Sequence, residues 1–242
     1  MSGPEIHTAP SAFADLYLRV REKEKRILSD EEVFLLPDTL RENPHAGEWE
    51  LRKDAMSRLI KYFKNKKQAL TLLEVGCGNG WLAHRLSLLH PISVTGLDVN
   101  ETELKQAARV FAAITNLDFY HGSIDDLIVS KNRFDVILFA ASIQYFPSLA
   151  EILHKAMQLL QPGGEIHILD SPFYDMDELQ PARQRTRQYY DELGFPGMAT
   201  FYFHHCKADL KNFRHYILHK PGSMFNLFRE NKNPFPWYCI KK

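Results

Sequence analysis

Three glycines at alternate positions are the feature of this sequence that most directly indicates chemistry. Gly76, Gly78 and Gly80 follow an apolar run that ends at Val75, and a helical pattern begins directly after them. Glycine lets the chain turn tightly at this point and lets a ligand lie against bare backbone, where a Cβ atom would collide with it. The segment therefore predicts a turn from a strand into a helix, with a nucleoside ligand bound against the turn.

Two acidic residues flank this turn at the ends of neighbouring predicted strands. Asp98 lies about 22 residues beyond Gly76, where a carboxylate can accept both hydroxyl hydrogens of a ribose. Glu74 lies just before the glycines, which is awkward beside a pyrophosphate but suits a cationic ligand that carries an α-amino group. Together these residues predict a nucleoside pocket outside the carboxyl ends of the central strands.

Details of the turn separate the possible ligands. The dinucleotide fingerprint has a third small residue for close packing of the helix on the strand, and Trp81 occupies that position here. The bulky indole argues against NAD. The sequence also lacks the G-x-x-x-x-G-K-[ST] run of a phosphate-binding loop, which excludes a P-loop nucleotide hydrolase.

Short apolar strands alternate with helical patterns between Thr71 and Asp170. The predicted strands are residues 71–75, 92–99, 117–121, 134–141 and 165–170, and two later candidates are residues 213–219 and 235–240. One helix is predicted over residues 81–90, and Asn100 with Glu103 and Ser148 with Glu151 have the spacing of helix-capping pairs. This alternation predicts a mostly parallel sheet with helices on both faces.

The first seventy residues differ in character from the rest of the chain. They contain helical patterns with a break at Pro37, and a further helical pattern begins at Glu48. We expect residues 1–70 to form a helical extension that caps the pocket and residues 71–242 to form the main domain. Trp49 and Arg52 fold over the ligand as a lid in one interpretation, and Trp49 anchors the core in the other.

Composition and charge argue against nucleic acid and membranes as partners of this chain. The 242 residues are 45% hydrophobic, and 30 Lys and Arg residues balance 30 Asp and Glu residues, so nothing in the net charge attracts nucleic acid. The longest apolar run, residues 136–141, is far shorter than the roughly 20 residues that cross a bilayer, so we expect no membrane span. Three cysteines without paired spacing and the lack of a secretory signal predict reduced thiols and a cytoplasmic protein.

Residues 71–170 resemble the class I S-adenosylmethionine-dependent methyltransferases. The resemblance is carried by the segments EVGCGNG, VTGLDVN, HGSIDDL, FDVILFAASIQYF and LQPGGEIHIL. It implies a Rossmann-like, mostly parallel seven-stranded α/β sheet with helices on both faces, closed by an antiparallel C-terminal hairpin. It also implies S-adenosylmethionine as the cofactor and a small molecule as the methyl acceptor.

The resemblance assigns contacts to individual residues. Glu74 and the glycines would face the methionine part of the cofactor, and Asp98 would take the ribose hydroxyls. With the lid residue Trp49 added, the cofactor contacts that we expect are Trp49, Glu74, Gly76, Cys77, Gly78, Gly80, Asp98, Val99, Ser123, Ile124, Asp125 and Ala140.

The segment beside the adenine departs from the family pattern. Many members have Asp where this chain has Ser123, so the adenine amino group is contacted by Ser123, by Asp125 or by the backbone at Ile124. Ser123 with Asp126 also has the spacing of a helix-capping pair, and this second interpretation stays open.

The residues that act on the acceptor are poorly determined by the sequence. Where many members have a histidine after the fourth strand, this chain has Gln144 and Tyr145. These two residues and the histidines His204 and His205 are the candidates for a catalytic role, since histidine has a suitable pKa for a general base. His204, His205 and Cys206 lack the spaced pairs of a structural zinc site, so we expect no metal.

The sequence therefore predicts a methyltransferase that aligns S-adenosylmethionine and a small-molecule acceptor for in-line displacement. A non-catalytic adenosyl-binding or scaffold protein of the same fold is the alternative from another class. A nicotinamide oxidoreductase is a weaker third hypothesis because of Trp81.

Overall fold

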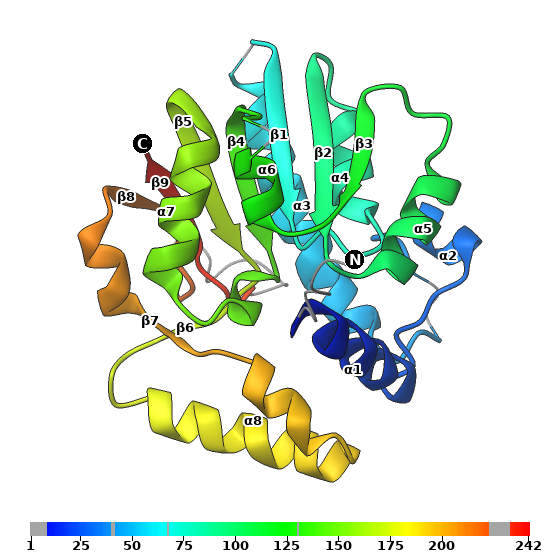
Figure 1. Cartoon of the computed structure of the whole chain (residues 1–242), viewed down its shortest axis with the longest axis vertical. Coiled ribbons are helices and arrows are strands. Elements are labelled where there is room, and N and C mark those ends of the chain that lie inside the picture. The colour runs from blue at the N-terminus through cyan, green and yellow to red at the C-terminus, as the bar shows by residue number, and fades with distance from the viewer. Residues whose placement is uncertain (1–8, 40–41, 67, 130, 223–232) are drawn as a thin grey trace, which may run out of the picture.

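The computed structural model describes residues 9–39, 42–66, 68–129, 131–222 and 233–242. Its centre is a seven-stranded sheet with the strand order β3-β2-β1-β4-β5-β9-β8 (Figure 1). The first five strands are parallel, and β9 is antiparallel to both β5 and β8, which confirms the predicted fold class. The strands are β1 (Leu70–Val75), β2 (Ile92–Asp98), β3 (Leu117–His121), β4 (Phe134–Ala140), β5 (Leu160–Leu169), β8 (His215–His219) and β9 (Trp237–Lys241).

Helices cover both faces of this sheet, as the alternating pattern predicts (Figure 1). One face packs against α3 (Ala46–Lys64), α4 (Trp81–Ser87) and α5 (Glu101–Val110), and the other against α6 (Ile124–Val129) and α7 (Leu149–Leu159). The central strands are buried on both faces because their side chains alternate between two separate hydrophobic clusters. This double-sided core fixes the positions of the strand ends that form the site.

Several boundaries differ from the sequence prediction. The helix that begins at Trp81 ends at Ser87, three residues before His90. Strand β5 begins at Leu160, five residues before the predicted start at residue 165, and Gln161–Gly164 form an irregularity in its pairing with β4. Pairing with β4 resumes at Glu165, directly after the two glycines.

The N-terminal segment is helical, and it has one interruption more than the one expected at Pro37. Helix α1 (Ala9–Lys23) is followed by α2 (Asp30–Leu35), where Ser29 and Glu32 form a reciprocal capping box. The predicted break at Pro37 lies between α2 and α3 and is therefore the second of two interruptions. Residues 1–8 and 40–41 of the expected extension lie outside the described residues.

An insertion between β5 and β8 places a further helix below the carboxyl ends of the strands. It contains β6 (Phe173–Tyr174), α8 (Leu179–Leu193), the short helix η2 (Pro196–Phe201), β7 (His205–Cys206) and the short helix η3 (Lys207–Asn212). Helix α8 ends at Leu193, where Gly194 adopts the left-handed conformation of a C-cap. In Figure 1, α8 and α1 both lie at this end of the sheet.

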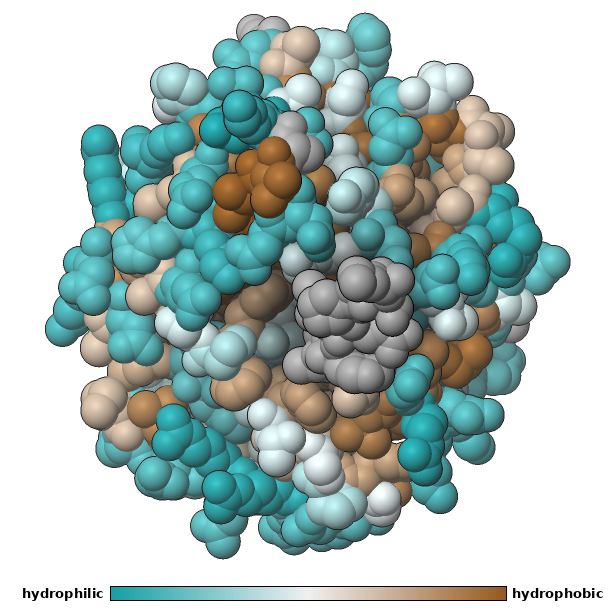
Figure 2. Space-filling view, viewed as in Figure 1, coloured by the Kyte–Doolittle hydropathy of each residue, from teal (hydrophilic) through white to brown (hydrophobic). Residues whose placement is uncertain are grey.

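A third, smaller hydrophobic cluster joins α1 to the insertion. Val20 of α1, Tyr190 of α8 and Met198 of η2 are buried together, apart from the two clusters on the sheet. This shared cluster gives α1 and the insertion a common hydrophobic core, so the two segments form one layer over the ends of the strands. On the face shown in Figure 2, hydrophilic side chains predominate and hydrophobic ones gather in small separate groups. Among the described residues, no helix is both long enough and apolar enough to span a bilayer.

Candidate active site

A cavity of about 470 Å³ lies between the carboxyl ends of β1, β4 and β5 and the layer formed by α1 and α8. Its size is within the range of small-molecule sites in enzymes. The sheet supplies backbone and acidic groups to its wall, and α1, α8 and Tyr202, which follows η2, supply aromatic groups. Two chemically different halves therefore meet in one space.

The glycine turn forms part of the cavity wall, and its backbone requires glycine. Gly76, Gly78 and Gly80 have φ angles of +75°, +53° and +74°, in the left-handed region that other residues rarely adopt. A Cβ atom on Gly76 would lie 2.5 Å from the Cβ of Ser142, which follows β4. The turn thus brings bare backbone against the end of the neighbouring strand, and Gly76 and Gly78 line the cavity.

Glu74 presents a carboxylate to the cavity with one oxygen unsatisfied. The side chain is 3% exposed, and its Oε2 atom has no hydrogen-bond partner among the described residues. Burial raises the pKa of Glu74 to about 8, and a backbone N–H of Ala83 offsets part of this effect. A buried acceptor without a donor is costly, so the site is suited to a ligand that brings a cation or a donor.

Asp98 is held by the backbone of the same turn. Its Oδ2 accepts a hydrogen bond from the Gly78 N–H at 2.7 Å, and its Oδ1 accepts one from the Asn100 N–H at 2.8 Å. Burial raises its pKa, and these backbone hydrogen bonds oppose that shift. The carboxylate therefore stabilises the glycine turn itself, and Asp98 is not among the residues that line the cavity.

Glu103 is a second acidic residue beneath the turn, and the sequence analysis gave it a different role. Asn100 caps α5 by accepting from the Thr102 and Glu103 N–H groups, but the Asn100 N–H donates to Asp98 and not to Glu103. The predicted cap at Asn100 is therefore confirmed, and the Glu103 side chain takes no part in it. Its carboxylate lines the cavity instead, and burial raises its pKa to about 7 while Arg21 opposes that shift.

Two residues that are not glycine adopt left-handed backbone conformations where β4 and β5 end. Ala141 has a φ of +52° and Asp170 a φ of +54°, and both line the cavity. Strained backbone of this kind persists where the surrounding structure enforces it and is concentrated at functional sites. Burial also raises the pKa of Asp170 to about 6.

Aromatic side chains form the opposite wall. Tyr17 of α1 packs edge-on against Tyr145, with ring centroids 5.7 Å apart, and Tyr145 packs against Tyr202 at 6.0 Å. Tyr190 and the fully buried Met198 complete this wall. Burial raises the pKa of all four tyrosines, so their hydroxyl groups stay protonated at neutral pH.

The structure brings half of the predicted site residues to the lining of this cavity. Of the predicted contacts, those that line it are Trp49, Glu74, Gly76, Cys77, Gly78, Ala140, Gln144 and Tyr145. Trp49 serves both interpretations offered for it, because it lines the cavity and is also buried against Trp81 in the core. The predicted contacts outside the lining are Gly80, Asp98, Val99, Ser123, Ile124, Asp125, His204 and His205.

The segment expected beside the adenine is occupied by local interactions. The N–H and the hydroxyl of Ser123 both donate to Asp126 Oδ2, at 2.7 and 2.8 Å, which is the capping arrangement. Asp125 forms an ion pair with Lys155 at 2.9 Å, and Ile124 is buried. The contacts of Ser123 are therefore those of the helix-capping interpretation.

The two histidines have partners away from the cavity. His204 Nε2 lies 2.9 Å from the Thr186 hydroxyl, and His205 Nε2 lies 3.0 Å from the Ile143 carbonyl oxygen. Burial lowers the pKa of both imidazoles. Gln144 is also engaged, since its amide donates to the Ala141 carbonyl and accepts from the Ser171 hydroxyl. It follows that Gln144 orients the loop of the short helix η1 (Ile143–Tyr145) at the cavity.

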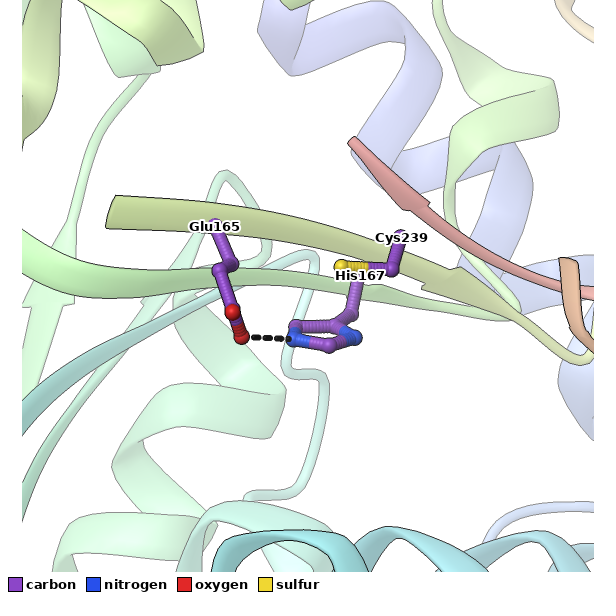
Figure 3. A group of neighbouring side chains, drawn as sticks. All are labelled: Glu165, His167 and Cys239. Carbon is purple, nitrogen blue, oxygen red and sulfur yellow. Dashed lines mark hydrogen bonds and ion pairs between the residues drawn. The ribbon is translucent and has the colours of Figure 1, made fainter. Parts of the chain in front are cut away.

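One buried group among the described residues has the composition of a metal site. Glu165, His167 and Cys239 lie close together on β5 and β9 (Figure 3). Glu165 is also bound by Lys66 and Lys241, and both ring nitrogens of His167 have partners, because Nε2 meets Glu165 and Nδ1 accepts from Trp237. These contacts satisfy the cluster internally, so we interpret it as a structural network and not as a metal centre.

Sequence reasoning missed the residues that come from outside the glycine turn. Arg21 and Tyr17 lie on the lining from α1, and Tyr190 and Tyr202 lie on it from the insertion. Only the fold shows that these distant segments meet, and their composition resembles any amphipathic surface. Glu103 did carry a signal in the sequence, since it lies five residues after Asp98. Its spacing from Asn100, however, was interpreted as that of a helix cap.

Comparison with known proteins agrees with this geometry. The sheet order and the glycine turn define the Rossmann-like class of methyltransferase folds. The model of the family described as "Methyltransferase domain" matches residues 66–222, more than half of the chain. The chain therefore belongs to this methyltransferase domain family.

Curated relatives match over part of their length. A phthiotriol/phenolphthiotriol dimycocerosates methyltransferase of Mycobacterium ulcerans is 35% identical over 100 residues, which is 41% of this chain and 36% of the relative. A 27-O-demethylrifamycin SV methyltransferase of Amycolatopsis mediterranei is 26% identical over 56% of this chain and 54% of the relative. The aligned region thus spans between about a third and a half of these relatives.

Solved structures share the fold over nearly the whole chain. Magnesium protoporphyrin IX methyltransferase from Synechocystis, with bound S-adenosylmethionine, has a TM-score of 0.63 at 11% identity and covers 99% of this chain and 100% of its own. A plantazolicin methyltransferase in complex with S-adenosylhomocysteine has a TM-score of 0.58 at 16% identity, covering 96% of this chain and 98% of its own. At these identities the likeness supports the fold alone.

Proposed function

We propose that this chain is an S-adenosylmethionine-dependent methyltransferase that acts on a small-molecule acceptor. The observation that carries the proposal is the buried carboxylate of Glu74, a residue that lines the cavity beside the glycine turn and whose Oε2 lacks a hydrogen-bond partner among the described residues. The α-amino group of S-adenosylmethionine is a cation of the kind that such an acceptor requires. Membership of the methyltransferase domain family supports the same assignment.

Different residues bind different parts of S-adenosylmethionine in this proposal. Glu74 binds the amino group, and Gly76 and Gly78 let the ligand lie against backbone. Asp98 fixes the glycine turn and lies at the strand end where a ribose is expected. When bound, S-adenosylmethionine would supply a sulfonium methyl group that a nucleophilic acceptor atom can attack in line, with S-adenosylhomocysteine as the leaving group.

The enclosure of the cavity supports a small acceptor. Helix α1 and the insertion cover the strand ends, and their tyrosines form an apolar wall with protonated hydroxyl groups along it. Such a wall excludes water and aligns the acceptor, and alignment can supply about 7–11 kcal/mol of rate acceleration. The names of the two curated relatives also refer to small molecules, which supports this acceptor class.

No general base is assigned within this proposal. The four candidates differ in access, because His204 and His205 lie outside the cavity lining while Gln144 and Tyr145 belong to it. Tyr145 stays protonated, so it serves as a hydrogen-bond donor and a flat contact for the acceptor. A base is needed only where the acceptor arrives protonated.

The remaining predictions extend this proposal. Residues 1–70 act as a cap over the pocket of the domain formed by residues 71–242, which α1 and its contact with the insertion support. A cytoplasmic location is supported by three buried free thiols, those of Cys77, Cys206 and Cys239. Balanced charge supports a protein without a nucleic-acid partner.

Titration calorimetry with S-adenosylmethionine tests the proposed function. The unmodified chain is expected to bind it, and Glu74→Gln to bind it about 10- to 100-fold more weakly, because a charge-assisted hydrogen bond is worth about 1.5–3 kcal/mol. Glu101→Gln, which changes an exposed acid on α5, is the matched control. Equal binding by Glu74→Gln and the control, or binding of NAD in preference to S-adenosylmethionine, would contradict the proposal.

Transfer of a labelled methyl group separates the enzyme from the scaffold alternative. The chain is incubated with labelled S-adenosylmethionine and the small-molecule fraction of a cell extract. We expect label in an extractable product. A chain that binds the donor but labels nothing in this fraction or in the complete extract would favour the non-catalytic protein.

A further inference from the structure

Arginines contribute to the cavity wall, and one of them is left without an acidic partner. Arg21 of α1, Arg26 and Arg52 all line the cavity. The two oxygens of Glu48 lie 2.6 Å from an Arg26 nitrogen and 2.5 Å from an Arg52 nitrogen. Arg26 also pairs with Glu24 at 3.1 Å. Among the described residues, the Arg21 guanidinium forms no ion pair within 4 Å, and its buried Nε has no hydrogen-bond partner.

The unpaired guanidinium is an unusual group to keep away from water. Arginine stays positively charged at every pH that a folded protein experiences. Its Cζ atom lies 5.6 Å from the centre of the Tyr17 ring, and such a cation–π contact replaces only part of the lost hydration. A partly buried charge without an opposite charge is costly, so Arg21 is suited to a ligand that brings an anion.

The surroundings of Arg21 favour the acceptor over the donor as the source of that anion. Arg21 contacts Tyr17, which packs edge-on against Tyr145, so the guanidinium belongs to the aromatic wall. The carboxylate of S-adenosylmethionine is attached to the same carbon as the amino group, and it therefore stays near Glu74. Burial lowers the pKa of Arg21, and Tyr17 and Glu103 are the neighbours that raise it most. Glu74 is not among these neighbours.

The charge and shape of the wall indicate which anion fits. One unpaired cation balances one negative charge, and the acids Glu74, Glu103 and Asp170 on the same wall repel a doubly charged phosphate. A carboxylate has one charge, and its two oxygens match the planar fork of a guanidinium. Tyr145 and the fully buried Met198 supply apolar surface for the rest of the molecule.

We propose that Arg21 binds a carboxylate group of the methyl acceptor, and that the acceptors of this enzyme are small monocarboxylic acids with an apolar body. This inference rests on the proposed function and names the substrate class of the same site. Arg21 thus determines specificity, because it selects an acid over the neutral amide of the same shape. The amide leaves the guanidinium without its partner, which is the kind of mismatch that gives strong discrimination.

Binding of matched acids and amides to the chain saturated with S-adenosylhomocysteine tests this assignment. The probes are 4-hydroxybenzoate, 4-hydroxycinnamate, indole-3-acetate and octanoate, each compared with its amide by calorimetry. In at least one pair the acid is expected to bind about 10- to 100-fold more tightly than the amide, as for a charge-assisted hydrogen bond. In Arg21→Gln, that acid and its amide should bind within about twofold of each other.

Two controls separate this effect from a general change in charge or folding. Lys23→Gln removes the same charge from an exposed position of α1 that does not line the cavity, and it should keep the preference for the acid. The affinity of Arg21→Gln for S-adenosylhomocysteine should stay within about threefold of the unmodified chain. Retained affinity shows that the variant is folded and that Arg21 does not hold the donor.

Several outcomes would overturn the inference. The four pairs could show no preference for the acid, or Arg21→Gln could keep the preference. A loss of S-adenosylhomocysteine affinity in Arg21→Gln as large as the loss for the acid would assign the guanidinium to the carboxylate of the donor. If the unmodified chain binds no S-adenosylhomocysteine, the proposed function fails and this inference fails with it.

A crystal structure of the unmodified chain with S-adenosylhomocysteine and the preferred acid removes any dependence on the folding of the variants. We expect a carboxylate oxygen of the acid within about 3.2 Å of a guanidinium nitrogen of Arg21. An acid bound away from Arg21, or the carboxylate of S-adenosylhomocysteine in its place, would overturn the inference while the proposed function stands.

Discussion

At the scale of single residues, the site depends on positions that combine a left-handed backbone conformation with close packing against a neighbouring residue. Gly76 combines a left-handed φ with a Cβ position only 2.5 Å from Ser142. Gly163 in β5 also has a left-handed φ, of +79°, but nothing lies within 4 Å of its Cβ position. Substitution of Gly163 therefore tests the energetic cost of the left-handed backbone alone, whereas substitution of Gly76 adds a steric clash with Ser142.

Alanine substitutions at these two glycines are expected to differ in stability and in binding. Gly163→Ala should lower the free energy of unfolding by about 1–2 kcal/mol, the cost of the left-handed conformation alone. Gly76→Ala should lose about 1–3 kcal/mol more through overpacking and should no longer bind S-adenosylhomocysteine. Urea titration and calorimetry measure both effects, and equal losses at the two positions would contradict the close approach of Gly76 to Ser142.

The buried acids predict how stability depends on pH. Burial raises the pKa of Glu74 to about 8, so the folded chain keeps a proton that the unfolded chain releases above pH 4.5. The associated stability is complete below about pH 4.5 and is lost as the pH rises through about 8. Glu74→Gln should therefore reduce the decline in unfolding free energy between pH 5 and 8, by at most about 1.4 kcal/mol per pH unit. Parallel pH profiles for Glu74→Gln and the unmodified chain would refute the raised pKa.

At the scale of elements, β5 and β9 are joined by a polar network away from the cavity. Glu165, 3% exposed, accepts from the Tyr62 hydroxyl and binds Lys66 and Lys241. It also meets His167, which accepts from the Trp237 indole. These contacts hold the pKa of Glu165 well below its usual range although burial opposes them. The network fastens the antiparallel edge of the sheet to α3.

Removing this charge should destabilise the fold without changing the site. Glu165→Gln is expected to lower the free energy of unfolding by about 3 kcal/mol, because it leaves two lysines without their partner. Its affinity for S-adenosylhomocysteine should stay within about twofold of the unmodified chain, since Glu165 does not line the cavity. Glu151→Gln, which changes an exposed ion pair, should cost less than about 1 kcal/mol. Loss of ligand affinity in proportion to stability would contradict the separation of network and site.

The elements also show which predictions the sequence supports. Strands and helices between residues 71 and 170 were predictable because apolar periodicity, capping residues and the glycine turn agree with one another. The ends of β5 and the position of the Glu103 side chain were not, since tertiary contacts decide them. Pairing with β4 on both sides of Gly163 keeps this irregular segment within β5, and Asp98 accepts the Asn100 backbone N–H.

At the scale of the whole molecule, half of the site was predictable and half was not. Residues of the glycine turn are close in sequence, so their types and spacing identify the donor half of the cavity. The opposite wall comes from α1 and from the insertion after β5, and only the fold brings Tyr17 and Tyr190 to one space. Acceptor specificity therefore belongs to segments whose local patterns predict nothing beyond amphipathic helices.

The central claim is that the glycine turn and its acidic neighbours bind a sulfonium nucleoside. The most direct test is a crystal structure of the chain grown with S-adenosylhomocysteine. We predict the nucleoside along Gly76 and Gly78, with its amino nitrogen within about 3.2 Å of the Glu74 carboxylate. A ligand bound elsewhere, or one in this cavity whose amino group points away from Glu74, would contradict the account.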